Sequence, residues 1–554
     1  MSAVPDVVVL RKARGAFFTP PDVARFIAGW AIRTPGDRVL EPSCGDAAVL
    51  RAAADRLAEL GGDRHEARLH GVEMHGPSAE EARLRLASSA VGGAAEIRIA
   101  DFFTLDPDPR FDAVIGNPPY IRYQDFSGEQ RARSRAAALR AGVALSRLAS
   151  SWAAFTVHSA LFLRPGGRLG LVLPAELLTV NYAAGVRSFL MEHFSGVRLV
   201  VFEERVFPGV QEEVVLLLAD GYSPGPGGGT DHCELVQARN AADLAADLAA
   251  TIWRPAGAAS KWTASVLQPA GLDAYRDAVA APGFAELEDW GQTTLGMVTG
   301  NNRYFALSPQ RVTELGLRRS DLIPISPPGS RHLRQLSFTA AARRQLGQDG
   351  AATWLLRPGC PSPAAAAYIA AGEAGGVHLA YKCKVRSPWW RVPCLDPADI
   401  LLTYMNADTP MLCANQAGAH HLNSVHGIYL DPGLRQLGRQ LLPLAALNSV
   451  TMLGAEIVGR AYGGGILKLE PREADRLPVP SPALVSERAR RLAAVRGRVI
   501  RLLRGGRLGE AARAVDDVLF ADSGLISGAA LAEVRNARIG LAARRSARGR
   551  ESRS

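Results

Sequence analysis

The sequence predicts an α/β fold with a mostly parallel, Rossmann-like sheet over residues 1–222, followed by a mixed α+β domain. Short apolar segments alternate with helical patterns along the first stretch, as in a series of βα units. Only about eight residues, RVFPGVQE, separate the last two apolar segments, which is too few for a crossover helix. These two segments should therefore pair antiparallel at the end of a seven-stranded sheet.

Each expected strand is a short apolar run next to turn or polar residues, and each expected helix has apolar residues at helical spacing. The expected strands are Arg38–Pro42, Arg68–Glu73, Glu96–Phe102, Phe111–Gly116, Arg168–Pro174, Val197–Glu203 and Glu212–Asp220. The expected helices are Val23–Ile32, Ala48–Leu60, Ser78–Ala87, Ser151–Leu163 and Ala184–Phe194.

The composition changes after residue 222. Residues 223–231, SPGPGGGTD, have the composition of a linker. Residues 232–482 contain frequent turns and clustered tryptophans without a βα alternation, which predicts an irregular second domain. Residues 483–540 are helical by their alanine, arginine and leucine content, and the basic tail 541–554 is expected to be disordered.

The bulk properties restrict the class of protein only loosely. The chain has 554 residues and a formal charge of +10, which suits a polyanionic partner. Only five residues are lysine, so this charge reflects an arginine-rich composition and is weak evidence for nucleic acid. The six cysteines form no CxxC pair, and no apolar run reaches the roughly 18 residues of a membrane span. We therefore expect a cytoplasmic protein with reduced thiols, no metal site and no membrane segment.

The strongest local signal is the sequence Asn117-Pro118-Pro119-Tyr120, which directly follows the expected strand Phe111–Gly116. The Asn117 side-chain oxygen and the Pro118 carbonyl can each accept an N–H hydrogen bond from an amino group. Two prolines hold this turn rigid, and the Tyr120 ring offers a face on which a flat base can stack. The turn is suited to methyl transfer to a weakly nucleophilic exocyclic or amide nitrogen.

A second group of residues lies at the ends of the first three expected strands. In EPSCGD, Glu41 offers a carboxylate to an ammonium group, such as the methionyl end of S-adenosylmethionine, and Gly45 permits a close backbone approach. Glu73 is suited to bind ribose hydroxyls. Asp101 and the adjacent Phe102 are suited to bind an adenine amino group and ring. Acidic or amide groups at four successive strand ends predict one nucleotide-like site.

Together these motifs resemble the DNA amino-methyltransferases, in particular the TaqI-like, gamma-class N6-adenine methyltransferases of bacterial restriction–modification systems. That family has a class I methyltransferase sheet, which ends in an antiparallel hairpin. The chain order matches the family: a cofactor-clamping segment at residues 15–21, EPSCG, the GVE and ADFF strand ends, NPPY, and a target-recognition domain last. The motif match covers residues 11–222, with a looser likeness over 285–480.

The resemblance implies S-adenosylmethionine as cofactor, double-stranded DNA as partner and an adenine flipped out of the duplex as target. By this likeness Asn117 to Tyr120 carry the chemistry, and Phe207 stacks on the flipped base opposite Tyr120. A monomer is expected, because the chain has one active site and one recognition region. The implied cofactor-binding residues are Thr19, Glu41, Pro42, Cys44, Gly45, Glu73, Asp101, Phe102 and Phe155.

The sequence leaves several alternatives open. Ala47 stands where the family commonly has a second glycine, which puts cofactor affinity in doubt. The NPPY turn also suits methylation of RNA, of a protein glutamine or of cytosine N4, and the fold could serve a non-catalytic DNA-binding component. Fewer than twenty residues precede the clamping segment, so we expect no fused nuclease domain upstream.

Overall fold

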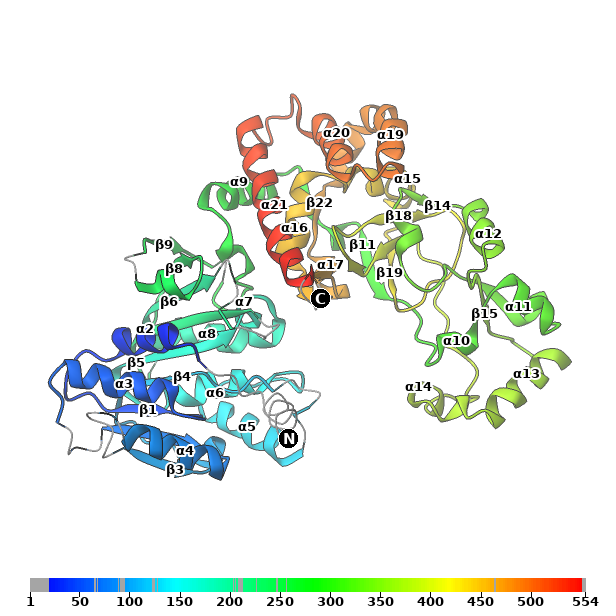
Figure 1. Ribbon diagram of the computed structural model, residues 1–554. Helices are drawn as coiled ribbons and strands as arrows, with labels where there is room; N and C mark the ends of the chain where they lie inside the picture. The colour runs from blue at the N-terminus through cyan, green and yellow to red at the C-terminus, as the bar shows by residue number, and fades with distance from the viewer. Residues whose placement is uncertain are drawn as a thin grey trace. The chain divides into compact units, whose positions relative to one another are not determined.

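The computed structural model describes residues 19–550 except 64–65, 67, 88, 90–94, 122–124, 127, 203, 205, 208–212, 226, 246–247, 256 and 463–464. The chain divides into two units, Met1–Val266 and Leu267–Ser554 (Figure 1). The segment Gly15–Phe18, which was expected to contribute to the cofactor clamp, lies outside the described residues.

The first unit contains a nine-stranded sheet with the order β3-β2-β1-β4-β5-β7-β6-β8-β9. Strands β3, β2, β1, β4 and β5 are parallel, whereas β7 pairs antiparallel with both β5 and β6. The predicted Rossmann-like sheet with an antiparallel β6–β7 pair is therefore confirmed. Two further strands, β8 and β9, continue the sheet beyond β6, so the described residues form nine strands where seven were expected. The strands are β1 Val39–Glu41, β2 Leu69–Glu73, β3 Glu96–Ile99, β4 Phe111–Gly116, β5 Leu163–Pro174, β6 Phe194–Phe202, β7 Val214–Tyr222, β8 Cys233–Ala238 and β9 Ala250–Trp253.

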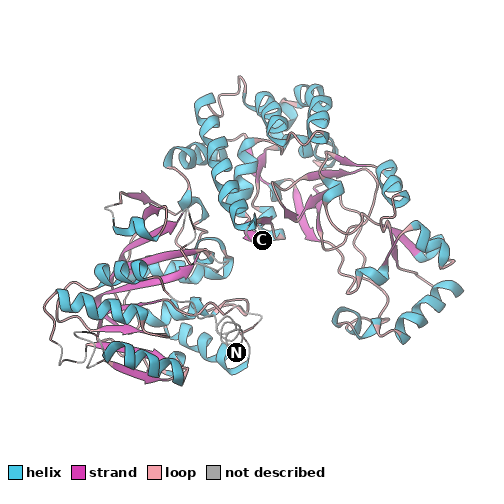
Figure 2. Cartoon of the chain, viewed as in Figure 1, coloured by secondary structure: helices cyan, strands magenta, loops and turns pink. Residues whose placement is uncertain are grey.

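Helices between the strands cover this sheet (Figure 2). Helices α2 and α3 pack against each other and against the central strands, and α6 packs on β5. The apolar positions of these helices, such as Ile27 and Leu57, are fully buried, as their helical spacing predicts. The helices are α2 Pro21–Ala31, α3 Ala48–Glu59, α4 Gly76–Ala87, α5 Gly128–Arg140, α6 Ser151–Ala160, α7 Glu176–Thr179 and α8 Ala184–His193.

The structure places the boundary of the first unit later than the sequence suggests. Strand β8 pairs parallel with β6, and β9 pairs antiparallel with β8, so residues 233–253 extend this sheet. The segment 223–231, interpreted as a linker between domains, joins two strands of one sheet instead. The physical reason is that β6 would otherwise be an edge strand with unpaired backbone groups.

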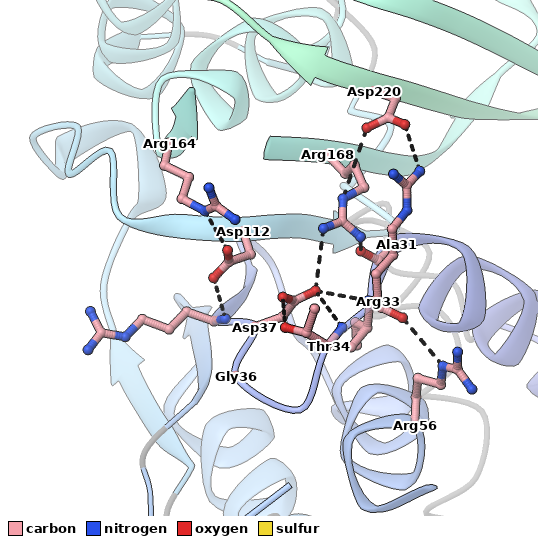
Figure 3. Close-up of polar contacts among 12 residues, drawn as sticks. Ala31, Arg33, Thr34, Gly36, Asp37, Arg56, Asp112, Arg164, Arg168 and Asp220 are labelled. Carbon is pink, nitrogen blue, oxygen red and sulfur yellow. Dashed lines mark hydrogen bonds and ion pairs between the residues drawn. The ribbon is translucent and has the colours of Figure 1, made fainter. Parts of the chain in front are cut away.

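A buried polar network joins the strands at the edge where the parallel strands begin (Figure 3). Asp37 precedes β1 and accepts hydrogen bonds from the Arg33 amide at 2.9 Å and the Thr34 hydroxyl at 2.5 Å. Arg168 of β5 lies 3.4 Å from Asp37 and 4.0 Å from Asp220 of β7. Burial opposes ionisation, but these hydrogen bonds and the Arg168 charge lower the pKa of Asp37.

Replacing Asp37 with alanine is expected to lower the free energy of unfolding by about 3 kcal/mol, because Arg168 is then left as a buried and poorly paired cation. Urea denaturation of the full chain measures this change. Because the folded pKa of Asp37 is lowered, its contribution is present above the ordinary carboxyl pKa and is lost as the pH falls. The control Asp22→Ala removes an exposed pair with Arg25 and should cost within about 0.5 kcal/mol. Equal stability losses in both variants would contradict this role.

The second unit is built on a five-stranded sheet with the order β11-β19-β16-β18-β14. Helix α15 (Arg435–Ala445) packs on β18, and α19 (Ala489–Arg504) and α20 (Leu508–Phe520) pack beside α15. This arrangement fits the predicted mixed α+β domain. The strands are β11 Gly291–Leu295, β14 Ser337–Phe338, β16 Ile400–Thr403, β18 Leu412–Asn415 and β19 Val425–Leu430.

A second cluster of buried side chains in this unit surrounds a three-stranded sheet, β12 (Ala306–Leu307), β15 (Trp354–Leu356) and β13 (Leu322–Pro324). Phe305 and Leu355 lie at its centre and are fully buried. The surrounding helices are α10 Asn302–Phe305, α11 Pro309–Glu314, α12 Ala340–Gln348, α13 Pro363–Ala374 and α14 Tyr381–Lys384.

The C-terminal part of the chain belongs to the second unit. Strands β10 (Phe284–Glu286) and β22 (Pro478–Pro480) pair antiparallel. Helix α21 (Gly528–Arg550) packs against α9 (Pro269–Ala280) and α16 (Ser449–Val458). The expected disordered tail begins inside this helix, where Arg545 is 3% exposed and forms a 2.7 Å ion pair with Glu456. Buried charge pairing therefore orders this part of the tail.

The remaining elements are β17 Met405–Asn406, β20 Arg460–Tyr462, β21 Ile466–Lys468, α17 Pro471–Asp475 and α18 Pro482–Glu487. Among the described residues, no single helix is long and apolar enough to cross a membrane. Helices α15 and α16 meet that test only as a pair, and the pair is bent by 89°.

Candidate active site

A cavity of about 540 Å³ lies at the edge of the first sheet where β1, β2 and β4 end. The carboxyl ends of parallel strands meet at this edge, which is where open α/β sheets bind ligands. The cavity brings together most of the predicted site residues. These are Thr19, Glu41, Pro42, Cys44, Gly45, Glu73, Asp101, Phe102, Asn117, Pro119 and Phe155.

Glu41 ends β1 and is only 2% exposed. Its Oε2 atom accepts the Leu50 amide at 3.1 Å. Gly116, the last residue of β4, makes room for it, because a Cβ at that position would lie 3.2 Å from Glu41 Cγ. Burial raises the pKa of Glu41 well above its usual value; the Leu50 hydrogen bond opposes the shift, and nearby carboxylates add to it. A cationic ligand group would stabilise the ionised form.

The loop after β1 folds sharply into α3. Gly45 has φ +50°, and its amide donates to Glu73 Oε2 at 2.9 Å. Ala47 also has a left-handed φ, +60°, which costs a residue with a Cβ about 1 kcal/mol. Ala47 is fully buried and does not line the cavity. Alanine in place of the second glycine therefore strains the loop backbone. It does not reduce the volume of the cavity.

Cys44 is 3% exposed, and its amide donates to the Val72 carbonyl at 2.9 Å. Burial and the carboxylates of Glu41 and Glu73 raise the pKa of its thiol. A neutral thiol is a poor nucleophile, so Cys44 acts as a lining residue of the loop.

Glu73 ends β2 and holds the loop after β1 in place. Its two carboxylate oxygens accept the Gly45 amide at 2.9 Å and the His75 amide at 2.8 Å. Each carboxylate oxygen has two lone pairs, so both can accept a further hydrogen bond. The arrangement is therefore suited to bind two adjacent hydroxyls from one side.

Asp101 follows β3 and caps a short 3₁₀ turn by accepting the Phe103 amide at 3.0 Å. Its other oxygen lies 3.3 Å from Arg133 Nη1 of α5. The Phe102 and Phe155 rings are nearly parallel, with centroids 5.7 Å apart, and both line the cavity. This part of the site therefore combines an apolar wall with one carboxylate.

The Asn117–Tyr120 turn lies at the end of β4, where Asn117 and Pro119 line the cavity. Tyr120 is 7% exposed and does not line it. The Tyr120 hydroxyl lies 2.8 Å from Asn117 Oδ1 and 3.0 Å from the Val172 carbonyl oxygen, so one proton is shared between two acceptors. Tyr120 therefore orients the Asn117 amide in this state of the protein.

Phe207 and Pro118 also remain outside the lining of the cavity. Phe207 is 4% exposed, and much of the loop that carries it falls among the residues that are not described. Its stacking role stays a prediction from the resemblance.

Ser151 is a positioning residue that the sequence did not reveal. Its hydroxyl donates to the Pro119 carbonyl and accepts the Ile121 amide at 2.9 Å. The Ser151 amide donates in turn to the Ile121 carbonyl at 3.1 Å. The start of α6 therefore holds the turn in place. A serine at the start of a helical pattern is typical of a helix cap. No signal in the sequence distinguishes a serine that also holds the Asn117–Tyr120 turn.

The fold and the cavity define a Rossmann-like methyltransferase domain joined to a second domain. Two family models match the chain in that order. The N-6 DNA methylase model matches residues 8–221, and the C-terminal domain model of the type II methyltransferase M.Eco57I matches residues 259–520.

Relatives that align with most of the chain agree with these family matches. M.XamI, a type II methyltransferase of Xanthomonas campestris pv. amaranthicola, is 26% identical over 84% of this chain and 85% of its own. M.AccI of Acinetobacter calcoaceticus is 21% identical over the same shares. The type IIL restriction–modification enzyme MmeI, solved in complex with DNA, has the same fold at 10% identity, with a TM-score of 0.58 over 98% of this chain and 76% of MmeI.

These matches confirm the predicted resemblance to the DNA methyltransferases of restriction–modification type, and to the N6-adenine methylases among them. The gamma order of motifs and the roles of the single site residues stay predictions.

Proposed function

We propose that this protein transfers a methyl group from S-adenosylmethionine to the N6 amino group of an adenine flipped out of double-stranded DNA. The observation that carries the proposal is the position of Asn117 on the same cavity as Glu41, Glu73 and Asp101. One site thus contains an amide that can accept from an amino group. It also contains carboxylates that can bind a nucleoside and an ammonium group.

The cavity residues fit the cofactor in size and chemistry. A volume of about 540 Å³ lies in the range of small-molecule sites. Glu41 would attract the charged methionyl part, and Glu73 would accept hydrogen bonds from the ribose hydroxyls. Phe102 and Phe155 would form an apolar wall beside the adenine, with Asp101 at its amino group. When bound, the cofactor supplies an electrophilic methyl group on a sulfonium.

Catalysis by this chain would rest on Asn117. As the target nitrogen becomes tetrahedral, its N–H bonds point at the Asn117 amide oxygen and the Pro118 carbonyl, and this hydrogen bonding strengthens in the transition state. A half-turn of the amide would let Nδ2–H donate to the Tyr120 oxygen while the Tyr120 hydroxyl donates to the Val172 carbonyl oxygen. Asn117 Oδ1 would then turn from Tyr120 toward the substrate. Tyr120 and Phe207 would stack on the flipped base.

Cofactor affinity is expected to rise with pH, because Glu41 must be ionised to hold a cationic group. The pKa of Glu41 is raised, so part of the population is protonated at a pH where an ordinary carboxyl is ionised. Binding should therefore release protons, which calorimetry in buffers of different ionisation enthalpy detects. Glu41→Gln should remove both the proton release and the pH dependence. Proton release of equal size in this variant would assign it to another group.

Incubation of the protein with labelled cofactor and either genomic DNA, RNA or bacterial protein tests the proposal. We expect label in DNA only, recovered as N6-methyladenine after digestion. Recovery as N4-methylcytosine would correct the target base, and label confined to RNA or to protein glutamine would replace the proposed substrate. We further propose that the enzyme works as a monomer in the cytoplasm and that its second unit reads the DNA sequence.

A further inference from the structure

The second unit exposes a short segment in which apolar and basic side chains alternate. We call residues 379–385 the 379–385 finger; it contains α14 and lies at the end of the lobe that carries α10 and α13 (Figure 1). Leu379, Tyr381 and Val385 are 57%, 75% and 66% exposed. Tyr381 is the most exposed large hydrophobic side chain among the described residues. Clustered exposed apolar groups of this kind mark interaction surfaces.

The segment that carries the finger is basic. Residues 374–395 contain four basic residues and no acidic residue. Two of the five lysines in the chain, Lys382 and Lys384, lie here and are exposed, so the arginine-rich composition does not explain them. Within the described part of the chain, neither lysine has a carboxylate partner, and Lys382 lies 5.7 Å from the Tyr381 ring centroid.

Buried contacts hold the base of the finger. Cys383 is fully buried, and its thiol lies 3.8 Å from the Thr299 carbonyl oxygen. Arg386 donates to the carbonyls of Thr299, at 2.8 Å, and Val298. Gly300 has φ +87°, and a Cβ there would lie 3.1 Å from Lys382 Cβ. The finger is therefore anchored on a tight turn, and its exposed side chains are presented from a fixed base.

We propose that the 379–385 finger contacts double-stranded DNA, with Lys382 and Lys384 on phosphates and Tyr381 and Val385 against sugars and base edges in a groove. This inference rests on the proposed function. The two exposed lysines are complementary to phosphate, and the apolar side chains beside them are suited to contact sugars and base edges in a groove. A protein partner fits less well, because lysine is depleted from protein–protein interfaces.

The first experiment measures binding of the full chain to a labelled duplex of mixed sequence over a series of salt concentrations. The double variant Lys382→Gln/Lys384→Gln is expected to weaken binding and to reduce the slope of log K against log salt by about 2. The control Arg25→Gln/Arg83→Gln removes the same charge from helices α2 and α4, where each arginine pairs with an acid. This control should leave the slope at the wild-type value. An equal fall in both would mean that the loss is one of net charge, which overturns the proposal.

The second experiment separates the aromatic contact from the charge. Tyr381→Ala is expected to raise the Kd for DNA by about tenfold with an unchanged salt slope, because the contact that is lost is apolar and not ionic. Ile539→Ala, at a 60% exposed position of α21, is the matched control and should leave Kd unchanged. Thermal unfolding of each variant checks the fold. If both finger variants keep the wild-type affinity and salt slope while methyl transfer to DNA is intact, the finger does not contact DNA. The proposed function would then stand without it. Label found only in RNA or protein would remove the proposed function and the finger together.

Discussion

Asn117→Ala is expected to reduce the rate of methyl transfer to DNA by about 10³-fold while the Kd for the cofactor stays within about twofold of wild type. Asn117 lines the cavity, and after the proposed half-turn its amide oxygen would accept a hydrogen bond that strengthens only as the target nitrogen becomes tetrahedral. A loss of this size corresponds to about 4 kcal/mol of transition-state stabilisation. Single-turnover transfer of labelled methyl to DNA measures the rate, and calorimetry measures the cofactor affinity.

Asn181→Ala is the matched control, because Asn181 is exposed in the same unit and does not line the cavity. It should transfer methyl at the wild-type rate. Parallel loss of transfer and cofactor binding in Asn117→Ala would instead assign Asn117 to folding or cofactor capture. The hydroxyl of Tyr120 adds a further reason to measure stability, since Asn117→Ala removes one of its two acceptors.

The site was predictable where it follows from the strand pattern. The apolar run Phe111–Gly116 matches β4 residue for residue, so the position of Asn117 at the carboxyl edge follows from the sequence alone. Glu41 and Glu73 likewise end β1 and β2. Polar residues directly after parallel strands meet at one edge, which is why local sequence sufficed to group them.

The parts that were not predictable depend on distant contacts. Ser151 holds the Asn117–Tyr120 turn from about thirty residues away, and Gly116 admits Glu41 from another strand. Strands β8 and β9 follow a glycine- and proline-rich segment that looks like the end of a domain, and their pairing with β6 depends on an edge that only the folded sheet presents. Tertiary context decides such features, and local propensity carries no signal for them.

Glu73→Ala is expected to raise the Kd for the cofactor by about 100-fold, the second large effect. Two hydrogen bonds that ribose hydroxyls donate to the carboxylate would be lost, at about 1.4 kcal/mol each. The same change removes the acceptor of the Gly45 and His75 amides, so the loop after β1 also loses its support. Calorimetric titration with the cofactor measures the affinity, and the rate at saturating cofactor should fall much less than in Asn117→Ala.

Glu73→Gln separates the two contributions. Glutamine keeps one acceptor oxygen for a backbone amide but loses the charge and the second acceptor, so an intermediate increase of about tenfold is expected. Glu80→Ala is the control, because Glu80 is an exposed partner of Arg83 on α4 and lies outside the cavity lining. Cofactor affinity equal to wild type in Glu73→Ala would remove Glu73 from the binding site. If Glu73→Gln binds as weakly as Glu73→Ala, the carboxylate charge, and not the number of hydrogen bonds, decides the affinity at this strand end.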